Sequence, residues 1–159
     1  MRLMQKRLIE KLAENKRRLL MSEIKEKLVP CAERGFTYRF ADLAQSKQLL
    51  ELVLSNSIPA NTREVDALEK TEAKQLIWKI SQSYVAYDDR DVLLFHQYSS
   101  EIGALISSFG KCLEHLDGIF ECIGFDKGLL NHSFILVEPK GQFGLCILHT
   151  EYGCEVVYW

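Results

Sequence analysis

The chain has 159 residues, which suits one domain of ordinary size with a buried core. Its hydrophobic fraction of 47% and charged fraction of 26% are average for a soluble globular protein. No apolar run approaches the roughly 20 residues that span a bilayer, and the charged N-terminus does not resemble a secretory signal. The five cysteines form an odd set without a disulfide-scaffold spacing. We therefore expect a cytoplasmic protein with reduced thiols.

The charge is distributed unevenly along the chain. Residues 1–40 hold 11 Lys/Arg against 5 Asp/Glu, a net charge of +6, whereas residues 81–159 hold 4 against 11, a net charge of −7. Residues 41–80 are nearly balanced, with 5 against 6. Polarity of this kind indicates charged macromolecular partners.

The N-terminal half is predicted to be mainly helical. A long helix over residues 2–28 is expected to end at Pro30, because proline cannot donate the helix hydrogen bond. A second helix is predicted from about Phe40 to Leu54, and a third from an Asn61 N-cap to about Ser83. The apolar positions of the first helix form one expected stripe: Met4, Leu8, Leu12, Leu19, Ile24 and Leu28. Its Lys and Arg residues alternate with Glu, which favours the solvated face of a packed helix over a phosphate-tracking or membrane-surface helix.

The C-terminal half changes to an extended pattern. We predict a strand at 84–87, an acidic turn, a strand at 92–96, and a helix from Ser99 or Ser100 that ends near Asp117-Gly118. A terminal antiparallel sheet follows, with strands predicted at Ile119–Phe125, Ser133–Glu138, Phe143–His149 and Cys154–Trp159. The middle strands are apolar on both faces, so both faces should be covered, the second one by the long N-terminal helix or by a partner.

The order of these elements predicts an α+β fold. N-terminal helices should pack on a C-terminal, largely antiparallel β-sheet with one inserted helix. We expect a single domain over 1–159, with residues 1–83 mainly helical and residues 84–159 forming a β-α-β-meander.

Motifs that would fix a chemistry are absent from the sequence. Cys112-x-x-His115 and Cys146-x-x-His149 have a ligand-like spacing, but residues three apart in a strand point to opposite faces, which argues against the second pair. No nucleophile elbow, phosphate-binding glycine loop or H-E-x-x-H is found. The acidic turn at 88–91 is weak evidence for a Mg²⁺ site. The sequence therefore predicts no enzyme, no catalytic residue, no metal and no cofactor.

Acidic residues of the C-terminal half could instead match a basic protein partner, or simply keep the domain soluble. The segment Asp91-Val92-Leu93-Leu94-Phe95…Ile102…Phe109 and the closing run from Phe143 to Trp159 resemble, in layout, bacterial immunity proteins. These are the cytoplasmic antidotes of polymorphic toxins, including contact-dependent growth inhibition systems.

The resemblance implies a non-catalytic protein that binds a cognate toxin domain, expected to be basic and often a nuclease, and covers its active site. The partner-binding residues expected on this basis are Asp88, Asp89, Asp91, Tyr98, Asp117, Glu121, Asp126, Glu151, Tyr152 and Glu155. The alternative is a nucleic-acid-associated or regulatory protein that uses the basic N-terminal helix, and a small enzyme comes third. We expect no membrane partner, and nucleic acid is disfavoured as a partner.

Overall fold

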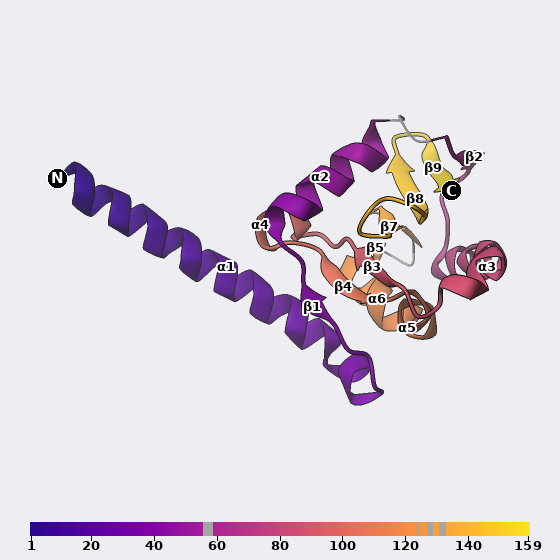
Figure 1. Ribbon diagram of the computed structural model, residues 1–159, viewed down its shortest axis with the longest axis horizontal. Helices are drawn as coiled ribbons and strands as arrows, with labels where there is room; N and C mark the ends of the chain where they lie inside the picture. The colour runs from indigo at the N-terminus through magenta and orange to yellow at the C-terminus, as the bar shows by residue number, and fades with distance from the viewer. Residues whose placement is uncertain (56–58, 124, 127–128, 131–132) are drawn as a thin grey trace.

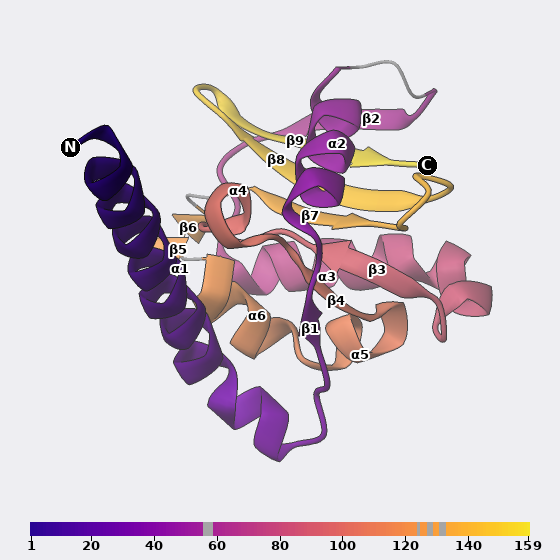
Figure 2. The ribbon, with the colours of Figure 1, turned by 60° about the vertical axis from the view of Figure 1, so that its left-hand side comes forward.

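A computed structural model of the chain describes residues 1–55, 59–123, 125–126, 129–130 and 133–159. Side chains are described for the same residues except 125–126 and 129–130. Its centre is a seven-stranded antiparallel sheet with the order β1-β4-β3-β7-β8-β9-β2 (Figures 1 and 2). The strands are β1 (Arg39–Phe40), β2 (Asn61–Val65), β3 (Asp91–Leu94), β4 (Leu105–Ser108), β7 (Phe134–Val137), β8 (Gly144–Thr150) and β9 (Gly153–Tyr158). A separate pair joins β5 (Phe125–Asp126) and β6 (Leu129–Leu130).

Helices lie on both faces of the sheet and at its margin. They are α1 (Arg2–Glu33), α2 (Leu43–Leu54), α3 (Lys70–Ser81), the 3₁₀ helix η1 (Gln82–Tyr87), α4 (Ser99–Ile102), α5 (Phe109–Glu114) and α6 (Leu116–Ile123). Helical and antiparallel β structure are both extensive, so the predicted α+β class is confirmed.

The sheet separates two apolar cores, which confirms that its middle strands are covered on both faces. The larger core joins one sheet face to α3, α5, α6 and the C-terminal part of α1. The smaller core lies on the other face under α2, where Leu49 and Val53 meet Ile135 and Cys146. The second face is therefore covered by α2, and the long N-terminal helix instead packs within the layer on the first face.

Several predicted boundaries in the N-terminal half are wrong. Helix α1 does not end at Pro30 but continues to Glu33. The proline removes one helix hydrogen bond, and the buried Cys31 packs the last turn onto the core and so keeps it helical. Helix α2 begins at Leu43, because Phe40 pairs with Leu105 of β4 and Asp42 provides the N-cap.

The predicted helix start at Asn61 is also wrong, and this correction matters most for the site. Residues Asn61–Val65 form strand β2, which pairs with β9 from Asn61 opposite Tyr158 to Val65 opposite Cys154. Helix α3 begins later, at Lys70. The long-range pairing with β9 therefore outweighs the local capping pattern.

In the C-terminal half, three segments differ from the prediction. The predicted strand at 84–87 is the 3₁₀ helix η1, whose i, i+3 spacing stacks Tyr84 and Tyr87 against Phe143, with ring centroids 6.0 and 4.6 Å apart. The single helix predicted after Ser99 is broken at Gly103, which has a φ of +89°, and β4 and α5 follow it.

The predicted strand Ile119–Phe125 is mostly helix α6, which ends at Ile123. Its buried residues repeat at helical spacing: Leu116, Ile119, Phe120 and Ile123. An apolar run of this length fits a strand or a buried helix equally well, so the sequence pattern alone does not distinguish them.

Buried His96 joins β3 to the loop that follows α4. Its Nδ1 accepts a hydrogen bond from the backbone N–H of Tyr98 at 3.1 Å, so its Nε2 carries the proton and donates to the Gly103 carbonyl at 2.8 Å. Burial lowers the pKa of His96 from 6.5 to about 4. The imidazole is therefore neutral at physiological pH.

This burial predicts a pH-dependent stability. Because the pKa of His96 is lower in the folded state, the unfolded chain takes up the proton first as the pH falls. The stabilisation is complete above pH 6.5 and is lost as the pH falls toward about 4, by about 3 kcal/mol in total at roughly 1.4 kcal/mol per pKa unit. Urea unfolding should show this loss in the wild type and a flatter profile in His96→Gln. Parallel profiles would contradict it.

The C-terminal Trp159 closes the turn between β7 and β8. Its indole Nε1 donates to the Gly141 carbonyl at 2.9 Å, and its backbone exchanges two hydrogen bonds with Gly144, both 3.1 Å long. The ring lies directly over Gly144, where a Cβ atom would overlap it. Glycine is therefore required at this position by packing.

We expect Gly144→Ala to lower the free energy of unfolding by about 2 kcal/mol, because the new methyl group must displace the indole ring. Removing the ring should remove the conflict. In the Trp159→Ala background, the same glycine substitution should therefore cost much less, and denaturant titration of the four proteins measures this coupling. Equal costs in both backgrounds would show that the indole is not the obstacle.

Candidate functional site: a groove beside the edge strand

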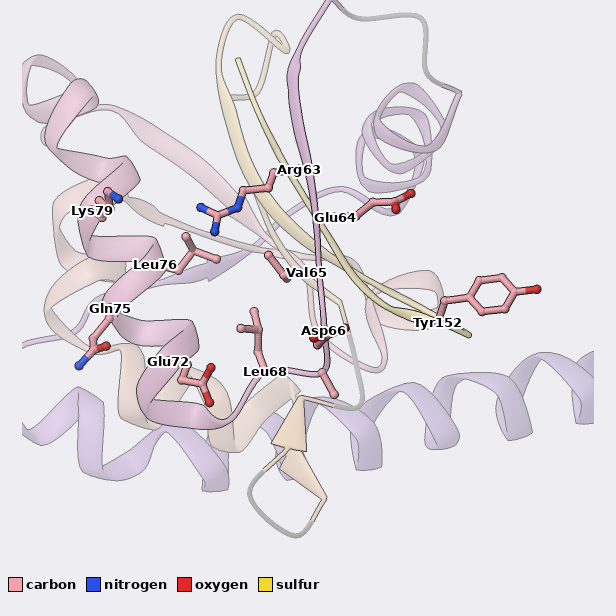
Figure 3. Close-up of a pocket in the computed structure, with 11 residues that line it drawn as sticks. Arg63, Glu64, Val65, Asp66, Leu68, Glu72, Gln75, Leu76, Lys79 and Tyr152 are labelled. Atoms are coloured by element: carbon pink, nitrogen blue, oxygen red, sulfur yellow. The ribbon is translucent and has the colours of Figure 1, made fainter.

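A groove runs between β2 and α3 (Figure 3). Its larger hollow has a volume of about 690 Å³, and a second hollow of about 260 Å³ adjoins it along the same strand, sharing Arg63, Leu76 and Lys79. Apolar side chains from β2, the following loop and α3 line part of the larger hollow: Val65, Leu68 and Leu76. The groove thus offers apolar surface bordered by charged side chains.

Strand β2 is the last strand of the sheet, so one of its edges is unpaired within the described residues. Its side chains alternate, with Arg63 and Val65 directed toward α3 and Glu64 directed to the opposite side (Figure 3). An exposed edge strand presents backbone donors and acceptors to which a partner can add a further strand. The groove and the strand edge can therefore recognise an extended segment of a protein.

The turn between β8 and β9 is held at one end of the groove. Gly153, with a φ of +140°, lies so close to β2 that an added Cβ would be 2.6 Å from the Val65 carbonyl oxygen. Its neighbour Tyr152 is 88% exposed and projects from the hairpin on the side of β2 away from α3 (Figure 3). Tyrosine combines a large apolar surface with a polar hydroxyl, which suits a protein interface.

Both signs of charge line the hollow itself, and acidic groups predominate once the opposite face of β2 and the adjoining hairpin are included (Figure 3). Arg63 and Lys79 are its basic lining residues. The acidic side chains of the lining and of the adjoining hairpin are Glu64, Asp66, Glu72, Glu151 and Glu155. Glu64 and Glu155 lie directly opposite each other on β2 and β9, so two like charges share one face of the sheet at a cost in stability.

A comparison with protein-family models matches residues 20–159 to the model described as YxiF protein. The chain belongs to the YxiF family. It is also 93% identical, over 156 residues, to a protein of Bacillus subtilis (strain 168) described as uncharacterized protein YxiF. That similarity covers 98% of this chain and 100% of the relative. No solved structure matches the chain.

The structure brings three of the predicted partner-binding residues of this YxiF-family chain together. Glu151, Tyr152 and Glu155 share the β8–β9 hairpin next to the groove. The acidic residues of the turn before β3 lie at the opposite end of the sheet. Leu93 of β3 pairs with Val137 of β7, and Val137 pairs with Gly144, where β8 begins. The start of β3 therefore lies beside the start of β8, whereas the β8–β9 turn follows the end of β8. The predicted contact residues therefore do not form one surface.

Other predicted contact residues have partners within the chain. Asp117 pairs with Lys74 at 3.1 Å and Lys70 at 3.7 Å, and hydrogen bonding to Lys74 lowers the pKa of Asp117. Glu121 lies 3.8 Å from the same Lys70. These lysines already offset the negative charge on this face of α6.

Two further predicted contact residues also have internal partners. The hydroxyl of half-buried Tyr98 donates to Glu23 of α1 at 2.9 Å and so helps to fasten that helix. Asp91 pairs with Arg39 at 3.7 Å. Asp88 and Asp89 are exposed at the same end of the sheet as Asp91, whereas the side chain of Asp126 lies outside the described residues.

The cysteines and histidines do not form a reactive centre in the described structure. All five cysteines are buried and unbridged, and burial raises the pKa of Cys112 and of Cys122 to about 12. Cys146 is buried while His149 is exposed, as expected for residues three apart in a strand. Within the described ranges, no group of three His, Cys, Asp or Glu residues could hold a metal ion, and His132 lies outside them.

Sequence reasoning does not identify the groove residues Arg63, Glu64, Asp66 and Glu72, because the pattern from Asn61 to about Ser83 predicts a single helix. One signal was available. The β-branched residues Thr62 and Val65 follow Pro59 and enclose two charged residues, a composition that is compatible with a short edge strand.

The Glu64–Glu155 pair generates a stability prediction. Glu64→Gln should raise the free energy of unfolding by about 0.5 kcal/mol, because it removes a like-charge repulsion across two strands. Glu151→Gln, which changes the charge equally at the hairpin turn, should have a smaller effect. Urea titration at low ionic strength measures both, and the difference should shrink in high salt. A destabilised Glu64→Gln would contradict the repulsion.

Proposed function

We propose that this chain is an immunity-type inhibitor, which binds a cognate toxin domain in the cytoplasm and covers its active site without catalysing a reaction. The observation that supports this most directly is the groove beside an open strand edge, with Tyr152 exposed next to it and acidic residues on the adjoining sheet face and hairpin. The acidic residues would attract a basic surface and accelerate its association. A nuclease domain, which binds phosphates, would offer such a surface.

The proposed contact divides into three physical parts. The free edge of β2 would pair with an extended segment of the toxin, and the apolar lining would receive its side chains. Tyr152 would pack against the toxin surface. The acidic residues of β2 and β9 would face basic side chains that otherwise contact the substrate of the toxin, so binding and occlusion would use the same groups.

The stability cost of the Glu64–Glu155 pair is consistent with this proposal. Two acidic residues opposite each other weaken an isolated sheet, but a basic side chain between them would turn that repulsion into attraction on binding. A site that is suboptimal for folding is a common property of binding surfaces.

The experiment is co-expression with the protein domain encoded immediately upstream of this gene, which the proposal identifies as the toxin. We expect the wild type to restore growth and to co-purify with the toxin domain. Tyr152→Ala and Glu64→Lys should each weaken the complex by roughly tenfold or more in calorimetry, as interface anchors do. Asp89→Lys makes the same charge change at the opposite end of the sheet, on an exposed residue, and should leave the affinity nearly unchanged.

Three results separate the possible outcomes. Neither rescue nor complex formation would refute the immunity function. Loss of binding in Asp89→Lys, with normal binding in Glu64→Lys, would move the contact to the turn before β3. Binding of nucleic acid by the isolated protein, weakening steeply with salt, would favour the alternative in which the basic residues of α1 contact phosphates.

A further inference from the structure

Helix α1 carries two apolar stripes, and the protein itself covers only one of them. Ile24, Leu28 and Cys31 are buried in the larger core. The residues of the second stripe lie between positions 4 and 19, mostly in the N-terminal half of the helix, which extends away from the body of the protein (Figures 1 and 2). They are Met4, Leu8, Leu12 and Leu19, each at least 59% exposed.

The two stripes point in nearly opposite directions. At 3.6 residues per turn, each residue advances by about 100° around the helix axis, so the exposed stripe spans roughly 80° and its centre lies about 160° from that of the buried stripe. The single stripe predicted from the sequence is therefore wrong. Its N-terminal members point away from the side of α1 that packs on the core, and they are exposed, as are Leu3 and Ile9 elsewhere on the projecting part of the helix.

The shape of the exposed stripe fits another helix better than a lipid surface. A narrow stripe of apolar residues is typical of a helix–helix seam, whereas a core-facing helix usually has a stripe wider than about 100°. The stripe contains methionine and leucine but no aromatic residue, although tryptophan and phenylalanine are typical of helices that lie in a membrane interface. Asn15 lies within the same arc, and one polar residue is common in a coiled-coil seam.

The basic residues beside the exposed stripe indicate that the partner helix is acidic. Residues 1–20 contain seven Lys/Arg and two Glu, a net charge of +5. On the helical wheel, Lys11 and Arg18 border the stripe on one side and Lys16 borders it on the other. Arg18 pairs with Glu14 and Lys16 with Glu101, but both cations remain exposed. A second copy would place basic borders against basic borders, whereas a helix with acidic borders would complement them.

We propose that the projecting half of α1 docks an amphipathic helix of another protein, whose apolar stripe is bordered by Asp and Glu. The seam would contain Leu8 and Leu12 at its centre, with Met4 and Leu19 at its ends. The match to the family model covers residues 20–159, whereas the similarity to the Bacillus subtilis relative covers 98% of the chain and so includes most of the projecting helix. This docking site is separate from the groove beside β2 and does not depend on the function proposed for that groove.

The test uses the full-length chain and two synthetic peptides of three heptads each. Both peptides have leucine at the a and d positions, with glutamate at e and g in one and lysine at e and g in the other. We expect fluorescence anisotropy to show binding of the acidic peptide only, weakening as salt is added. The double variant Leu8→Ser/Leu12→Ser should lower the affinity at least tenfold.

The matched control is Leu3→Ser/Ile9→Ser, which removes two equally exposed aliphatic residues that lie off the stripe. It should bind the acidic peptide as the wild type does. Unchanged thermal unfolding in both double variants would show that the fold is intact. Equal losses in both variants, or tighter binding of the basic peptide, would overturn the proposal, as would no binding at all.

Two further measurements test other occupants of the stripe. In analytical ultracentrifugation, self-association that Leu8→Ser/Leu12→Ser abolishes would identify a second copy as the occupant. In flotation with vesicles of phosphatidylglycerol and phosphatidylcholine, binding that the same variant abolishes would identify the membrane surface. Either result would replace an acidic helix as the occupant, whereas a monomer that does not bind vesicles supports it.

Discussion

The pairing of β2 with β9 is the contact on which the arrangement of the candidate site depends. It joins a strand from the N-terminal half of the chain to the last strand of the C-terminal half, over a register from Asn61–Tyr158 to Val65–Cys154. The segment that follows β2 then turns back and places α3 beside the same strand. One pairing thus creates the edge, the groove and the acidic pair, and it brings the hairpin turn next to them.

The sequence predicted best those elements whose local pattern and tertiary surroundings agree. Strands β7, β8 and β9 are rich in β-branched and aromatic residues between glycine or proline turns, and they lie where we expected them. Strand β2 and helix α6 show the opposite case. Asn61 followed by Glu64 imitates a capping box, and the run around Phe120 is apolar enough for either structure, so only contacts distant in sequence determine the outcome.

The same distinction explains how much of the candidate site could be predicted. Glu151 and Tyr152 can be predicted as exposed because a turn between two strands exposes its residues whatever the rest of the fold does, whereas Glu155 lies within β9 and is half-buried. The groove residues of β2 and α3 depend on a pairing that the sequence does not indicate. Acidic residues such as Asp117 could be identified as charged, but their ion pairs with lysines of another helix depend on the packing of α3 against α6.

The structure places the basic N-terminal residues and the acidic C-terminal residues on different parts of the molecule. The basic N-terminal residues lie on a helix that extends from the body, so their charge acts on the surroundings more than on the acidic half of the same chain. The lysines of α3 offset part of the acidity of α6, whereas the acidic residues near β2 outnumber the basic ones. Opposite charges are therefore presented on two separate surfaces, and neither surface can satisfy the other within one molecule. Under the two proposals, a basic partner would bind at the strand edge and an acidic helix along α1, each held by charge opposite to its own.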